Sequence, residues 1–210
     1  MSTFEQLSGE IVKGKRKLAI ASTNALLAAG QAPLDIINKA LVVGMSEVGV
    51  LFQENKVFIP EVLMSAKAMD ECLAILRPLM AGEEMQSNGT VLLATVQGDL
   101  HDIGKNLVGI MLESNGFTVV DAGKDVAPEV IVAKVRELNP DVVGMSAMLT
   151  TTLLHMKDTI ELLKEEGLRD KVKVIIGGAP VSDDFAGEIL ADGYSPDALS
   201  AVGLCKRLLA

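Results

Sequence analysis

The most constraining stretch of the sequence is an apolar run followed by a loop that carries a histidine between two carboxylates. Residues 91–96 (VLLATV) are typical of a buried strand, residues 98–104 (GDLHDIG) of a loop, and the residues from Lys105 of a helix. In an open α/β sheet, ligands bind outside the carboxyl ends of the strands. The sequence therefore predicts an α/β domain with a ligand site at His101.

Three common sites fit this loop poorly. A dinucleotide loop needs G-x-G-x-x-G, but Gly98 and Gly104 stand too far apart. A phosphate loop needs G-x-x-x-x-G-K-[ST], but this spacing is too long and Asn106 replaces the hydroxyl. A zinc site needs about three or four protein ligands, and no other His or Cys is nearby in the sequence. A metal held by an organic macrocycle needs a single axial imidazole, which fits better.

The motif Asp99-x-His101-x-x-Gly104 resembles the D-x-H-x-x-G signature of cobalamin-binding domains. The longer run GDLHDIGKN resembles methionine synthase and the corrinoid proteins of methyltransferase systems. This resemblance implies that His101 is the lower cobalt ligand, in place of the cofactor's dimethylbenzimidazole, whose nucleotide tail enters a deep pocket. The spacing lets Asp99 accept a hydrogen bond from the other ring nitrogen, which would fix the tautomer. The resemblance implies that Thr152 completes a relay to solvent, so Asp99, His101 and Thr152 are the expected catalytic residues.

The resemblance extends along the second half of the chain. Residues 146–152 resemble S-x-L-x-T-x-S, with Met148 in place of leucine and Thr152 in place of serine. The glycine pair at 177–178 would let the backbone approach the ligand, although a glycine pair also suits an ordinary turn. The cofactor-binding residues expected here are Gly98, Asp99, His101, Asp102, Ile103, Gly104, Ser146, Met148, Thr150, Thr152, Gly177 and Gly178.

Apolar periodicity over about residues 4–80 predicts a bundle of four amphipathic helices. Gly14 separates the first two helices, the segment 30–33 ends the second, and Pro60 opens the fourth. The third helix is expected over about 34–51. Val43 is expected on the buried side of the third helix and Leu63 among the apolar positions of the fourth.

Residues 52–62 resemble the cap motif F-x-x-G-x-x-F-L-P of the same family, with Asn55 in place of glycine. The resemblance implies an apolar lid over the upper face of cobalt, which would keep water from a reactive centre. Phe52, Ile59 and Val62 match the lid positions. An apolar stripe of this kind also fits an ordinary bundle core.

The periodicity stops over 80–89, which predicts a linker between a helical cap domain, 1–88, and a cobalamin-binding domain, 89–210. Alternating strands and helices predict a flavodoxin-like or Rossmann-like parallel sheet for the second domain. The expected strands are 90–96, 117–122, 141–147 and 172–176, and the expected helices are 105–114, 128–138, 152–166, 183–191 and 196–209.

The net charge of −9 argues against a nucleic-acid partner. The first 14 residues lack the apolar core of a signal peptide, and no apolar run has transmembrane length. Cys72 and Cys205 are far apart in helical patterns and are expected to be buried thiols, which fits a reducing cytoplasm. We therefore expect a cytoplasmic protein without a membrane partner.

The resemblance implies a corrinoid protein that carries a methyl group on cobalt between two methyltransferases. The first is specific for the methyl donor, and the acceptor of the second is a tetrahydrofolate or a thiol cofactor. A reductive activase is a further implied partner. Two alternatives stay open: a cobalamin-binding mutase subunit, which would need a substrate barrel, and a cobalamin-sensing regulator, which would need a DNA-binding element. A receiver-type phosphorylation module is weaker, since Ser146 stands where its aspartate would be.

Overall fold

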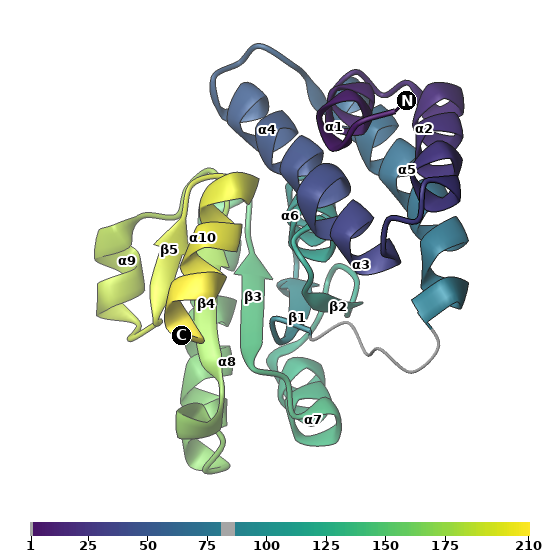
Figure 1. Cartoon of the computed structure of the whole chain (residues 1–210). Helices are drawn as coiled ribbons and strands as arrows, with labels where there is room; N and C mark the ends of the chain where they lie inside the picture. Colours follow the sequence, from purple (N-terminus) through teal and green to yellow (C-terminus); the bar gives the residue numbers. More distant parts are fainter. Residues whose placement is uncertain (1, 81–86) are drawn as a thin grey trace. The chain divides into compact units, whose positions relative to one another are not determined.

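The chain forms two compact units, which the computed structural model describes over residues 2–80 and 87–210 (Figure 1). One unit contains Met1–Gln86 with Ser114–Gly116, and the other contains Ser87–Glu113 with Phe117–Ala210. The predicted linker, 80–89, falls mainly on residues 81–86, which lie outside the described residues.

Short turns join the helices of the first unit at the breaks that the sequence predicts. Gly14, with a φ of +59°, separates the first two helices, and Pro33 occupies the first turn of the third. Thr3 caps the first helix, because its hydroxyl accepts a hydrogen bond from the backbone N–H of Gln6 at 3.1 Å. The elements are α1 (Phe4–Val12), α2 (Arg16–Ala28), α3 (Pro33–Ile36), the π-helical turn η1 (Ile37–Leu41), α4 (Val42–Gln53), α5 (Ile59–Leu76) and the 3₁₀ turn η2 (Arg77–Met80).

Two expectations about these helices were wrong. The third helix contains the π-helical turn η1, whose extra residue rotates the positions that follow it. Val43, just after this turn, is half exposed, whereas Leu41 and Met45 are buried. Leu63 is also exposed, because the buried stripe of α5 passes through the neighbouring Val62.

Within the described residues, the second unit has a five-stranded parallel sheet in the order β2-β1-β3-β4-β5. This is the flavodoxin-like order, one of the two arrangements, flavodoxin-like or Rossmann-like, that the sequence predicts. Its strands are β1 (Thr90–Thr95), β2 (Thr118–Asp121), β3 (Val142–Ser146), β4 (Lys173–Gly177) and β5 (Gly193–Ser195). Its helices are α6 (Ile103–Ser114), α7 (Pro128–Leu138), α8 (Leu154–Glu165), α9 (Asp183–Glu188) and α10 (Ala198–Leu208), with 3₁₀ turns η3 (Thr150–Thr152) and η4 (Arg169–Lys171).

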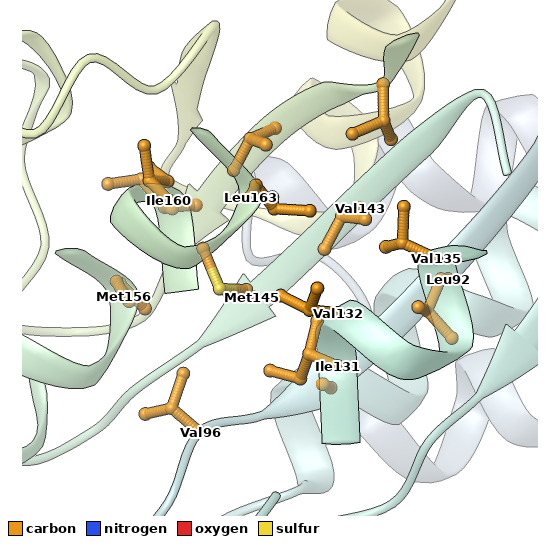
Figure 2. Packing of buried hydrophobic residues seen from close by; sticks show 14 of the residues in the cluster. Leu92, Val96, Ile131, Val132, Val135, Val143, Met145, Met156, Ile160 and Leu163 are labelled. Carbon is orange, nitrogen blue, oxygen red and sulfur yellow. The ribbon is translucent and has the colours of Figure 1, made fainter. Parts of the chain in front are cut away.

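Helices cover both faces of this sheet (Figure 1). On one face, Leu92 of β1 and Met145 of β3 belong to a cluster with residues of α7 and α8 such as Val132 and Ile160 (Figure 2). Strands buried on both sides read as continuous apolar runs, which is why the sequence predicts β1, β3 and β4. The sequence also predicts β2, which is an edge strand and is only partly buried. The prediction missed β5, a short edge strand that begins with a glycine.

Cys72 and Cys205 are free and buried, as predicted. Burial raises the pKa of the Cys205 thiol to about 11, so the thiol is protonated at neutral pH. No helix among the described residues has the length and apolarity that a membrane span needs.

Candidate functional site

The loops after β1 and β3 leave the sheet where its strand order reverses. From β1 the chain passes through α6 to β2 on one side, and from β3 it passes through α8 to β4 on the other. Loops that diverge from neighbouring strands leave a crevice between them, which is the usual ligand position in such sheets. His101 and Thr152 lie on these two loops.

The buried carboxylate of Asp99 joins the two loops. Its Oδ1 accepts hydrogen bonds from the backbone N–H and the ring Nδ1 of His101, at 3.0 and 2.7 Å. Its Oδ2 accepts from the backbone N–H groups of Met148 and Leu149, at 2.6 and 3.2 Å, and lies 3.1 Å from the Thr152 hydroxyl. The side chain of Asp99 is 0% exposed, so these donors replace water.

This environment fixes the charge of Asp99. Burial raises the pKa of the carboxyl, but the hydrogen bonds from the N–H groups of Met148 and His101, from the His101 ring and from the Thr152 hydroxyl lower it by more. The net pKa lies well below the ordinary value, so Asp99 is an anion at neutral pH. An ionised carboxylate only accepts hydrogen bonds. In neutral His101 the proton therefore lies on Nδ1, and the lone pair of Nε2 is free to bind a metal.

The imidazole of His101 is accessible, since its side chain is 58% exposed. A hydrogen bond also holds the backbone of His101, because the Thr95 hydroxyl donates to the His101 carbonyl at 3.3 Å. In the described part of the chain, no group of three or more His, Cys, Asp or Glu side chains is arranged to hold a metal ion. The other histidine, His155, lies on α8 with its Nδ1 3.2 Å from an Asp158 oxygen.

The structure brings Asp99, His101 and Thr152 together, as the sequence predicts. The Thr152 hydroxyl lies within hydrogen-bond distance of both the Asp99 carboxylate and the Leu149 carbonyl, at 3.1 and 2.8 Å. One hydroxyl proton is therefore shared between two acceptors. Thr152 is itself buried.

Exposed apolar side chains surround the loops at this end of the sheet. Gly104 lies at the start of α6, and apart from its chain neighbours and the backbone of its own helix, no atom of the described residues lies within 4 Å of a Cβ placed there. The open space at Gly104 and the exposed apolar groups suit a broad, mostly apolar ligand. We call this set the apolar rim: Leu100, Ile103, Met148, Leu149 and Leu154.

The remaining predicted residues of this unit lie at the same end of the sheet. Ser146 ends β3 and is half buried, and Thr150 is exposed at the start of η3. The half-buried Asp102 has an oxygen 3.7 Å from the Lys124 ammonium. Gly98 has a φ of +78°, so the loop requires a left-handed residue at this position.

The glycine pair at the end of β4 has a role within the protein. A Cβ on Gly178 would lie 1.8 Å from the carbonyl oxygen of Ala147, and one on Gly177 would lie 3.0 Å from that of Ser195. Gly178 also has a φ of +124°. The two glycines thus let the ends of β3, β4 and β5 approach one another, in addition to any contact with a ligand.

The three predicted lid residues of the first unit differ in exposure. Phe52 is half buried and Ile59 is exposed, but Val62 is 1% exposed and belongs to the helical core. Val62 therefore packs in the core of the helical unit and is not part of the exposed apolar surface that includes Ile59. Phe58, the second phenylalanine of the cap motif, was not among the predicted lid residues, yet it is the most exposed large apolar side chain of this segment.

Lys105 has a structural role near the site that the sequence does not predict. Its side chain is 2% exposed, and its ammonium lies 2.6 Å from both Asp121 carboxylate oxygens and 2.8 Å from the side-chain oxygen of Asn106. This ion pair ties the first turn of α6 to the end of β2. Nothing in the sequence indicates that Asp121 is the partner of this lysine.

Comparisons with known proteins agree over both units. Models described as B12 binding domains match residues 3–77 and 89–203. Over 209 residues, 99% of this chain, it is 46% identical to dimethylamine corrinoid protein 1 of Methanosarcina acetivorans, covering 97% of that protein. A cobalamin-binding protein from Desulfitobacterium hafniense shares 33% identity and the fold, with a TM-score of 0.83 and 99% of both chains covered. The methanol:cobalamin methyltransferase complex MtaBC from Methanosarcina barkeri matches at 34% identity with a TM-score of 0.84, covering 97% of this chain and 78% of that one.

Proposed function

Because the chain belongs to the B12-binding corrinoid proteins of methyltransferase systems, we propose that it carries a methyl group on cobalt with His101 as the lower axial ligand. Its cofactor is cobalamin. When bound, the cobalt supplies the chemistry, taking the methyl group from one partner enzyme and giving it to another.

The observation that carries this proposal is the hydrogen bond of 2.7 Å between Asp99 and Nδ1 of His101. It holds the exposed imidazole in the tautomer whose Nε2 can coordinate a metal. A corrin would supply the other nitrogen ligands itself, so His101 would be the one protein group needed to hold the cobalt. Asp99 and Thr152 tune the basicity of that nitrogen through the shared hydrogen bonds.

The surroundings of His101 fit a corrin. We assign the apolar rim to the lower face of the ring, because a flat macrocycle buries apolar surface on both faces. Gly98, Asp102, Ile103, Gly104 and Met148 contact the ring or its side chains in this assignment. Ser146, Thr150, Gly177 and Gly178 lie near the ends of β3 and β4 and contact the nucleotide tail.

Residues 1–88 act as a cap domain and residues 89–210 as the cobalamin-binding domain. The exposed side chain of Ile59 and that of Phe58 offer the apolar surface that shields the upper face of cobalt from water. Phe52 lies near the end of α4, before this segment. Val62 is buried one helical turn after Phe58, and its backbone N–H donates to the Phe58 carbonyl at 3.1 Å.

The methyl donor belongs to the methylamine class, which is supported by the name of the relative at 46% identity, a dimethylamine corrinoid protein. The partners are a donor-specific methyltransferase, a second methyltransferase whose acceptor is a thiol cofactor or a tetrahydrofolate, and a reductive activase. The matched methanol:cobalamin methyltransferase complex supports the first of these partners.

Reconstitution with cobalamin followed by desalting tests the proposal. We expect the protein to retain near-stoichiometric cobalt. After chemical reduction, a dimethylamine methyltransferase supplied with dimethylamine should methylate this cobalt, and the change in absorbance measures the methylation. Loss of all cobalt on desalting would contradict cobalamin binding. Retained cobalt that no methylamine or methanol methyltransferase can methylate would contradict the carrier function.

The open space at Gly104 gives a further prediction. Gly104→Ala should raise the free energy of unfolding by about 0.5 kcal/mol, because alanine is the better helix former and its Cβ meets no described atom. The same methyl group would crowd the corrin and weaken cobalamin binding about tenfold. Gly187→Ala, at an equally open helical position in α9, is the control that should gain stability without losing affinity. Unchanged affinity in Gly104→Ala would contradict the placement of the corrin against α6.

A further inference from the structure

A third loop, between β2 and α7, holds the loop that carries His101. The backbone N–H of Asp125 donates to the Asp99 carbonyl at 3.0 Å, and the Asp125 carboxylate accepts from the Gly98 N–H at 2.7 Å. Asp125 thus binds both residues of the Gly98-Asp99 dipeptide, one through its main chain and one through its side chain. His101 follows two positions later.

Further backbone bonds place this third loop against the end of β1. The Thr95 N–H donates to the Gly123 carbonyl at 3.0 Å, and the Val126 N–H donates to the Thr95 carbonyl at 3.1 Å. Val96 and Val126 form a parallel bridge. Asp125 therefore belongs to a loop that backbone hydrogen bonds hold against the end of β1, and from this loop it contacts the His101 loop.

The backbone conformation of Asp125 is one that glycine could also adopt. Its φ is +55°, in the left-handed region that glycine favours and that aspartate and asparagine tolerate. Glycine would fit this backbone but would lose the bond to Gly98. The facing residue, Gly98, is also left-handed, with a φ of +78°. The carboxylate is thus kept at a position where the backbone alone would favour glycine.

We propose that Asp125 is a positioning residue that holds the Gly98-Asp99 segment, and through it the His101 imidazole, in the orientation for cobalt ligation. This inference rests on the proposed function, because it needs His101 as the ligand. The Asp125 carboxylate acts through the Gly98 N–H, and its backbone N–H acts through the Asp99 carbonyl. If its carboxylate is removed, the Gly98 N–H loses its charge-assisted bond and the loop gains freedom. His101 then spends less time in the ligating orientation.

The test compares Asp125→Gly with Asp125→Asn, each loaded with methylcobalamin. Asparagine keeps a side-chain oxygen for the Gly98 N–H and adopts left-handed backbone readily. Glycine keeps the backbone and removes the oxygen. We expect Asp125→Gly to bind cobalamin about fivefold more weakly, as the loss of one hydrogen bond predicts, with part of its absorbance shifted to the form without imidazole. Asp125→Asn keeps a neutral hydrogen bond to Gly98, so it should lose less affinity than Asp125→Gly and keep the absorbance of imidazole ligation. Both variants should melt as cooperatively as the wild type.

The outcomes separate the two claims. If the wild type binds cobalamin through an imidazole and Asp125→Gly does the same with equal affinity, the inference is wrong and the proposed function stands. If Asp125→Asn fails as badly as Asp125→Gly, the bond to Gly98 is not the cause, which also overturns the inference. If the wild type shows no imidazole ligation, both fall. Asp125→Ser, whose hydroxyl is too short to reach Gly98, replaces the glycine variant if that variant does not fold.

Discussion

Replacing His101 with alanine is expected to weaken cobalamin binding by about 100-fold or more and to abolish the spectrum of imidazole-ligated cobalamin. The reason is that the imidazole is the metal ligand itself, and changes one step further from a metal already cost about 10–100-fold. Because the side chain of His101 is 58% exposed, its removal opens no core cavity and should leave the fold intact. The measurement is a titration with cobalamin followed by absorbance, with a thermal melt of the apoprotein alongside.

His155→Ala is the matched control for this prediction. His155 also pairs with a carboxylate, that of Asp158 at 3.2 Å, but it lies on α8 and not on the loop after β1. The variant His155→Ala should bind cobalamin like the wild type. Added imidazole should restore part of the ligated spectrum to His101→Ala, because the free base can enter the vacated position. A variant of His101 that keeps both the affinity and the spectrum would refute the assignment of the ligand.

The second large effect is expected from Asp99→Asn, which should lower the free energy of unfolding by about 3 kcal/mol. An amide has a single acceptor oxygen, so its NH₂ group must face donors either at His101 or at Met148 and Leu149. A buried donor without an acceptor costs about 1–3 kcal/mol, and the lost charge weakens the remaining bonds. If the NH₂ group faces Nδ1, the ring proton moves to Nε2 and ligation of cobalt fails. Denaturant unfolding of the apoprotein measures the stability.

The dependence of stability on pH in the acid range provides a second test of this prediction. The pKa of Asp99 is lowered from its ordinary value of 3.8, because the hydrogen bonds to the carboxylate outweigh the effect of burial. The ionised group therefore contributes its full stability above about pH 4 to 5, and this contribution is lost as the pH falls toward the lower folded pKa. The difference between wild type and Asp99→Asn should narrow below about pH 4. The control is Asp102→Asn, at a half-buried position three residues after Asp99. It should change the free energy of unfolding by no more than about 0.5 kcal/mol. A gap between wild type and Asp99→Asn that stays constant down to pH 2 would contradict this account.

The sequence predicted the parts of the fold that depend on local patterns. Buried parallel strands are apolar along their whole length, so β1, β3 and β4 were recognisable, and helix α7 begins and ends as predicted. The three-residue strand β5 has no such pattern, and its partner β4 defines it. The exposure of Val43 depends on a π-helical turn that periodicity does not reveal.

The site, like the fold, was predictable where it depends on residues that are close in the sequence. His101 and Asp99 are close in sequence, so their hydrogen bond followed from their spacing. Contacts between distant loops did not: neither the ion pair of Lys105 with Asp121 nor the bonds of Asp125 to the His101 loop has a local signal. The tertiary structure also shows that Gly178 is required for the approach of Ala147, whichever ligand binds nearby.

The central claim is that a protein histidine, His101, is the lower ligand of cobalt, and electron paramagnetic resonance of the Co(II) form tests it most directly. The protein is produced with ¹⁵N-labelled histidine and loaded with unlabelled cobalamin. An axial ¹⁴N nucleus splits each cobalt line into three, whereas ¹⁵N splits it into two. We predict twofold splitting that persists in His155→Ala and disappears in His101→Ala. Threefold splitting in the labelled protein would mean that the base of the cofactor is still the ligand, and it would contradict the account.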